Sequence, residues 1–142
     1  MAEKRNLEFQ KALEKKRILK FSRANELVKK ELEAAEDDLK EAKDRLKHKR
    51  YKYAIITAYY SMFHAARALI YSKGYREKSH YYLLVALQAL FAEKGLIEED
   101  LTKDFHTAMI LREGAESSIE SANEFLKKAE EILKRTIQII PD

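Results

Sequence analysis

The chain has 142 residues, of which 46% are hydrophobic and 37% charged, with a net charge of +4. This length is enough for one buried core, since a domain of about 150 residues hides roughly 70% of its unfolded surface. Three glycines and one proline are too few for Gly-rich phosphate loops or a turn-rich β fold, and the absence of cysteine excludes disulfides, thiolate metal sites and thiol nucleophiles. We therefore expect one domain of long helices with a mildly basic surface.

The most apolar stretch, Tyr53 to Tyr71, approaches the length of a membrane-spanning helix. It carries His64 and Arg67, and a charge is costly at the centre of a bilayer, so we expect a central bundle helix and no membrane association. Residues Met1 to Arg17 lack the apolar segment and cleavage site of a signal peptide, which favours a cytoplasmic protein.

The first half of the chain predicts two long helices after an N-terminal helical extension, residues 1–25. Within the extension, Leu7 to Phe21 is helix-compatible, either as a separate short helix or as the start of one long bent helix. From Val28 to Leu46 the apolar residues recur at alternating spacings of three and four, which places them on one stripe of a helix. Tyr51 to Ser72 is apolar or small on nearly every side, which predicts a helix surrounded by neighbours.

The second half predicts three more helical segments, separated by glycines. One runs from His80 to Glu93 with Ser79 as its cap, and another from Glu98 to Glu113. A capping box at Ser117 to Glu120 precedes a clean apolar stripe that ends at Pro141. The three glycines, Gly74, Gly95 and Gly114, all fall at predicted helix ends. We therefore predict an all-α, up-down-up-down four-helix bundle over residues 26–142, without strands.

The histidines do not have the spacing of a metal site. The four histidines, His48, His64, His80 and His106, form no His-x-x-x-His pair, and the one Glu-x-x-His match, Glu77 to His80, straddles a predicted loop. No strand-turn-helix elbow is predicted that could present a nucleophilic serine. We expect no metal and no cofactor.

Three polar residues of the central helix, Tyr60, His64 and Arg67, recur at spacings of four and three and so share one face. Buried polar groups need partners, because an unpaired one costs roughly 1 to 3 kcal/mol. The stripe therefore either meets a ligand or has a structural role, with Tyr60 and His64 as hydrogen-bonding groups and Arg67 paired with a carboxylate of a neighbouring helix.

Two further candidates lie at predicted helix ends. His80 is either a functional group or part of a helix cap. Arg112 and Glu113 are either a functional pair or a surface ion pair, which contributes little to stability.

Three segments together resemble the small prokaryotic HEPN-domain proteins. They are YAIITAYYSMFHAARALIYSKG from Tyr53 to Gly74, KSH from Lys78 to His80, and LREGA from Leu111 to Ala115. The likeness covers roughly Leu27 to Ile140. Proteins of that family are four- or five-helix bundles, usually dimeric and often encoded beside a minimal nucleotidyltransferase in toxin-antitoxin-like pairs.

The resemblance implies a module that binds a nucleotide or RNA phosphate, forms a homodimer and pairs with a nucleotidyltransferase. The residues that it suggests for phosphate binding are Arg67, Arg76, His80 and Arg112. Many HEPN proteins are also metal-independent ribonucleases in which a histidine acts as acid and base and an arginine, four to six residues earlier, steadies the phosphate.

This sequence departs from the ribonuclease pattern. Only three residues separate Arg76 from His80, and no histidine follows Arg112. A ribonuclease toxin that uses Arg76 and His80 as catalytic residues therefore stays an alternative to the binding module. A third alternative is a structural protein whose heptad-like first and last helices bind partner helices.

Overall fold

The protein is described by a computed structural model over residues 2–110 and 115–136. The all-α prediction is confirmed. The α-helices are α1 (Ala2–Glu14), α2 (Val28–Lys47), α3 (Tyr51–Ser72), α4 (His80–Leu87), α5 (Glu99–Ile110) and α6 (Ala115–Thr136). The short elements are β1 (Ile18–Lys20), the 3-10 turn η1 (Ala24–Leu27), β2 (Tyr75–Glu77) and the π-helical turn η2 (Gln88–Ala92).

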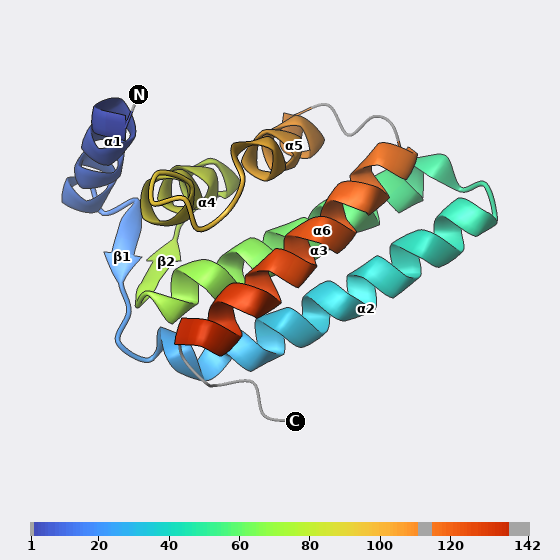
Figure 1. The fold of residues 1–142 in the computed structure, drawn as a ribbon, viewed down its shortest axis with the longest axis horizontal. Helices are drawn as coiled ribbons and strands as arrows, with labels where there is room; N and C mark the ends of the chain where they lie inside the picture. Colours follow the sequence, from blue (N-terminus) through green and yellow to red (C-terminus); the bar gives the residue numbers. More distant parts are fainter. Residues whose placement is uncertain (1, 111–114, 137–142) are drawn as a thin grey trace.

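The three longest helices, α2, α3 and α6, lie alongside one another, and α4 and α5 pack against α3 as well (Figure 1). α3 is the central helix, as predicted, because it is in contact with each of these four helices. α2 buries five residues of its predicted stripe, Val28, Leu32, Ala35, Leu39 and Ala42, and the sixth, Leu46, is half-buried. The small side chains of Ala35 and Ala42 let α2 and α3 approach closely. The Ser61 hydroxyl of α3 donates a 2.8 Å hydrogen bond to the carbonyl of Ala35.

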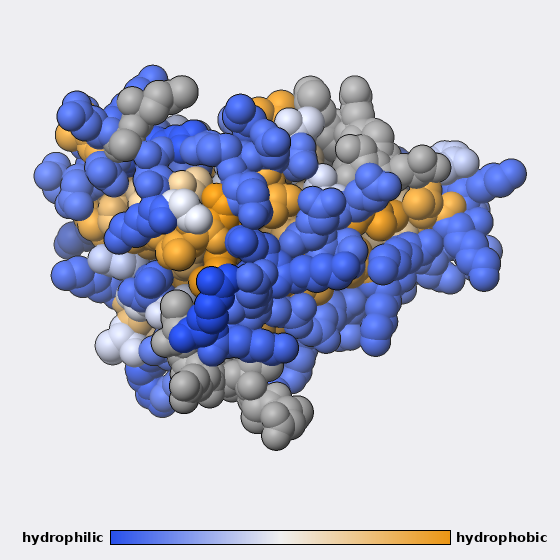
Figure 2. Space-filling view, in the orientation of Figure 1, coloured by the Kyte–Doolittle hydropathy of each residue, from blue (hydrophilic) through white to orange (hydrophobic). Residues whose placement is uncertain are grey.

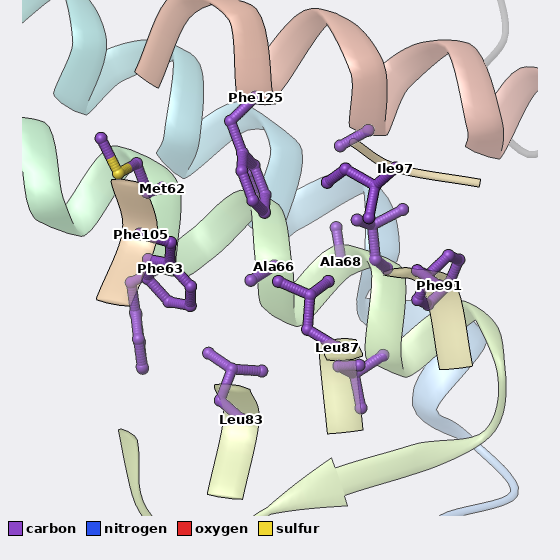
Figure 3. Close-up of a cluster of buried hydrophobic side chains, with 14 of the residues drawn as sticks. Met62, Phe63, Ala66, Ala68, Leu83, Leu87, Phe91, Ile97, Phe105 and Phe125 are labelled. Atoms are coloured by element: carbon purple, nitrogen blue, oxygen red, sulfur yellow. The ribbon is translucent and has the colours of Figure 1, made fainter. Parts of the chain in front are cut away.

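The hydrophobic core surrounds α3 and includes buried side chains of α2, α4, α5 and α6. The face seen in Figure 2 is mostly hydrophilic, with hydrophobic residues visible between the helices. In Figure 3, Phe125 reaches toward α3 from α6, and Leu83 and Leu87 approach from α4 on the opposite side. Phe105 of α5 is fully buried beside Phe125, with ring centroids 5.8 Å apart. No helix in the described ranges is long and apolar enough to cross a membrane.

Left-handed residues terminate several helices. Gly74 and Gly95 have φ of +83° and +69°, which confirms two of the predicted helix stops, while Gly114 lies outside the described residues. Lys16 and Lys49 adopt the same conformation, with φ of 58° and 60°. Around Lys49, the amide of Arg50 bonds the carbonyl of Arg45 and completes a Schellman-type end to α2.

Of the two alternatives for the N-terminal extension, the separate short helix is present, but the helix does not continue to Phe21, and the prediction of no strands is wrong. α1 ends at Glu14, and β1 then pairs antiparallel with β2, with Ile18 opposite Glu77. Three-residue strands are too short to show an alternating pattern in the sequence, so only the pairing reveals them. Phe9 of α1 and Ile18 of β1 are buried in the main core, and α1 packs against α4.

The third predicted helix also differs from a regular one. The α-helix ends at Leu87, and the wider turn η2 follows, with the amide of Glu93 bonded to the carbonyl of Gln88. A π turn inserts one extra residue and so rotates the side chains that follow it. This turn buries Ala89, Phe91 and Ala92 together.

Candidate functional site

The polar stripe of α3 divides between two groups of neighbours. His64 and Arg67 point to carboxylates of α2 and β2, whereas Tyr60 lies among aromatic rings next to His80. Phe63 contacts both groups: its ring centroid is 5.4 Å from His64 and 4.5 Å from His80. The predicted common face therefore meets two different environments.

The first group, called here the carboxylate cluster, consists of Glu31, Asp38, His64, Arg67 and Glu77. His64 Nδ1 lies 2.6 Å from Glu31 Oε2, and His64 Nε2 lies 3.6 Å from Asp38 Oδ2. Arg67 lies between two carboxylates, with Nη1 3.4 Å from Glu31 and Nε 3.1 Å from Glu77. The Arg67 guanidinium also donates to the Tyr71 hydroxyl and covers the Phe63 ring, with 5.3 Å between the guanidinium carbon and the ring centroid.

Burial dominates the electrostatics of the carboxylate cluster. Desolvation raises the pKa of Glu77, although Arg67 acts in the opposite direction, and burial likewise raises the pKa of Asp38 against the influence of His64. Within the described residues, Arg67 Nε and Glu77 Oε1 have no hydrogen-bond partner, so the pair is close but poorly aligned. Three carboxylates already surround Arg67 and His64, so this cluster is poorly suited to attract a phosphate.

The second group, called here the His80 cluster, consists of Tyr59, Tyr60, Phe63 and His80. The Tyr59 hydroxyl lies 2.6 Å from His80 Nδ1, and the imidazole stacks on Phe63. Tyr59 is completely buried and also stacks on Phe105 of α5 at 5.7 Å, so the hydroxyl that holds the imidazole is itself fixed.

α4 places His80 at its first residue. Ser79 is the N-cap, as predicted, and its hydroxyl accepts from the amide of Tyr82 at 3.4 Å. The backbone cap is thus supplied by Ser79, while the His80 imidazole turns toward α3. Tyr60 is half-buried beside it, and its hydroxyl makes no hydrogen bond to any described residue.

This arrangement suits hydrogen bonding to a ligand and proton transfer. A partner on one imidazole nitrogen sets the tautomer and orientation of the ring, which is how histidines are prepared for acid and base roles. The Tyr60 hydroxyl adds a donor and acceptor within the same aromatic surface. The His80 cluster is therefore the better candidate site of the two.

The other predicted residues lie elsewhere. Arg76 is exposed on β2, with its guanidinium over the Phe21 ring at 5.5 Å. His48 is exposed and bonds within α2 through Asp44. Arg112 and Glu113 lie outside the described residues. Over residues 2–110 and 115–136, no group of three His, Cys, Asp or Glu side chains could hold a metal ion.

Sequence reasoning missed the partners of the stripe, above all Tyr59, Glu31 and Asp38. Glu31 and Asp38 are seven residues apart, which is two helical turns, and so they share the face of α2 beside His64. That spacing was a usable signal. Tyr59 gave none, because a tyrosine in an apolar helix looks like ordinary core.

The chain matches known proteins over most of its length. The model of the HEPN domain matches residues 28–140. A Methanocaldococcus jannaschii protein named "Putative toxin MJ0605" is 32% identical over 118 residues, which cover 75% of this chain and 88% of that protein. A Thermotoga maritima UPF0332 protein is 28% identical over 76% of this chain and 86% of its own length. The Pyrococcus horikoshii UPF0332 protein PH1297 is 35% identical over 55% of each chain. The chain belongs to the HEPN domain family.

Proposed function

We propose that the chain is a toxin-like HEPN module of the cytoplasm that binds RNA or a nucleotide at the His80 cluster. The observation that carries the proposal is the 2.6 Å contact between the Tyr59 hydroxyl and His80, with the Tyr60 ring centroid 6.2 Å from that of His80. The His80 cluster thus offers an oriented imidazole, and the Tyr60 hydroxyl has no hydrogen-bond partner among the described residues. The family and the relative named as a toxin support the same reading.

The ligand-binding role predicted for His64 and Arg67 has less support than that of Tyr60 and His80. Carboxylates hold both side chains, and a phosphate would have to displace Glu31 or Glu77 to reach Arg67. We infer that these two residues have a structural role and hold α3 against α2 and β2. Arg112 and Glu113 stay predictions from the family resemblance.

Binding measurements on variants of the His80 cluster test the proposal. Calorimetry with AMP and ATP, and fluorescence anisotropy with a labelled single-stranded RNA, should show binding by the parent chain. His80→Ala should weaken it by about tenfold or more, since a hydrogen bond to a charged group contributes about 1.5 to 3 kcal/mol. Tyr60→Phe should weaken it by several-fold, because it removes only the hydroxyl.

Matched controls are His48→Ala and Tyr51→Phe, which change exposed residues at the end of α2 and the start of α3. They should bind like the parent chain. Absence of binding to every probe, or equal affinity for His80→Ala and the parent, contradicts the proposal.

A ribonuclease is the second candidate, favoured by the fixed orientation of the His80 imidazole. We also propose that the chain forms a homodimer and pairs with a minimal nucleotidyltransferase, in line with the family resemblance. Expression of the chain alone in bacteria should slow growth, and co-expression of a nucleotidyltransferase from the adjacent reading frame should relieve it. Slow growth and RNA cleavage that His80→Ala abolishes would establish the enzyme, whereas harmless expression without cleavage would leave the binding module.

A further inference from the structure

The two-stranded sheet has an outward face that the sequence pattern did not reveal. Leu19 lies opposite Arg76 in the ladder, and the bond from the Lys78 amide to the Arg17 carbonyl extends the pairing by one residue at that end. Side chains alternate between the faces of a strand, and opposite residues share a face. Ile18 and Glu77 are buried, so the side chains that alternate with them form the outward face of the sheet. It comprises Arg17, Leu19, Phe21, Arg76 and Lys78, called here the basic ribbon face.

The cations of the basic ribbon face are free of ion pairs with described residues, although the charge of Arg76 acts on the buried carboxylate of Glu77. Arg17, Arg76 and Lys78 are exposed, and none forms an ion pair with a described residue. Glu77, which lies between two of them in sequence, points inward to Arg67. The segment from residue 15 to 23 adds further charge, with five lysines and arginines and no acid.

This arrangement is unfavourable for the isolated protein. Like charges directly opposite each other in a sheet destabilise it, and Arg17 faces Lys78 in this position. Arg76 lies next along the same face, with its guanidinium held over the Phe21 ring at 5.5 Å. A guanidinium held this way keeps its planar set of donors pre-organised for phosphate oxygens.

We propose that the basic ribbon face binds the phosphate backbone of single-stranded RNA and leads the strand to the His80 cluster. The charges are complementary, since three exposed cations on one short ribbon match successive phosphates. The surface is also continuous in sequence with the proposed site, because Lys78 is followed by Ser79 and then by His80 at the start of α4. The proposal extends the proposed function by naming the surface that holds the RNA backbone.

The test compares the parent chain with the triple variant Arg17→Gln/Arg76→Gln/Lys78→Gln. Binding to labelled oligouridine is measured by anisotropy over a range of salt concentrations. Each phosphate contact on a single strand contributes about 0.7 to the slope of log affinity against log salt, so the triple variant should lose about 2 from that slope. Lys78→Gln alone should lose about 0.7, which keeps the test valid if the triple variant folds poorly.

The matched control is Lys40→Gln/Lys43→Gln/Lys47→Gln, which removes the same charge from the exposed side of α2. It should keep the parent slope. Circular dichroism and thermal unfolding establish that each variant is folded. Oligothymidine separates RNA from DNA, and inorganic polyphosphate reports on the ribbon face without any base.

The outcomes separate the two proposals. A parental slope in the ribbon variants, with weak binding by His80→Ala, overturns the ribbon proposal and leaves the proposed function intact. Loss of oligouridine and polyphosphate binding in the ribbon variants, with parental binding by His80→Ala, supports the ribbon and removes the role of His80. Binding of polyphosphate but not of oligouridine overturns the assignment of RNA as the occupant.

Discussion

Arg67 lies between carboxylates from two elements, Glu31 of α2 and Glu77 of β2. The side chain of Glu77 is 5% exposed, and burial raises its pKa. A raised pKa means that burial in the fold costs the ionised carboxylate more free energy than the protonated form, and the positive charge of Arg67 offsets part of that cost. The carboxylate cluster therefore ties the small sheet to α3 through one guanidinium.

Arg67→Met keeps most of the side-chain stem and removes the charge. We expect it to lower the free energy of unfolding at pH 7 by about 3 kcal/mol, at the lower end for a broken buried pair because the guanidinium is partly exposed. The loss should shrink as the pH falls toward 4, since protonated Glu77 no longer needs a cation. Urea unfolding curves at both pH values measure this.

The double variant Arg67→Met/Glu77→Gln distinguishes charge from packing. It should recover at least half of the lost stability, because no unpaired charge is left buried. Arg135→Met is the control, since its pair with Glu131 is exposed and should contribute only about 0.5 kcal/mol. Equal losses for Arg67→Met and the double variant would contradict the electrostatic explanation.

At the scale of elements, α2 and α6 bring two carboxyl groups together. Burial and a hydrogen bond with Glu36 raise the pKa of Glu130 to about 7. Because the folded pKa lies above the ordinary value of 4.5, this group contributes stability that is complete below pH 4.5 and is lost as the pH rises to about 7. The contact between the two helices should therefore weaken between pH 5 and pH 8.

Glu130→Gln should remove that part of the pH dependence. The amide can hydrogen-bond to Glu36 as the protonated carboxyl does, but it does not ionise. We expect the melting temperature of the parent to fall between pH 5 and pH 8 by more than that of the variant, and the variant to be at least as stable at pH 8. Glu124→Gln, on the exposed side of α6, is the control and should follow the parent. Parallel curves for all three proteins would contradict the prediction.

For the whole molecule, the sequence was most informative where a pattern repeats over several turns. The stripe of α2 and the apolar surround of α3 were both predicted correctly, because periodicity determines which face of a helix is buried. The glycine stops at Gly74 and Gly95 were also predictable. The stops at Lys16 and Lys49 were not, since lysine carries no preference for the left-handed region.

The site was harder to predict than the fold. Periodicity correctly grouped Tyr60, His64 and Arg67 on one face, but it contains no information on which neighbouring helix each side chain meets. The carboxylate partner of Arg67 was foreseen as an alternative, without Glu31 or Glu77 being named. Tyr59, which orients His80, depends on the packing of α3 against α4 and α5, and no local pattern specifies it.

The order of the chain has a consequence for its biosynthesis. β1 ends at Lys20, but its partner β2 is complete only at Glu77, after α2 and α3 have been made. At about 5 to 20 residues per second, the ribosome needs several seconds to supply the intervening segment. During that interval the nascent amino-terminal segment has its strand edge unpaired and Ile18 uncovered. A chaperone acting at the exit tunnel could bind this segment before α2 and α3 have emerged.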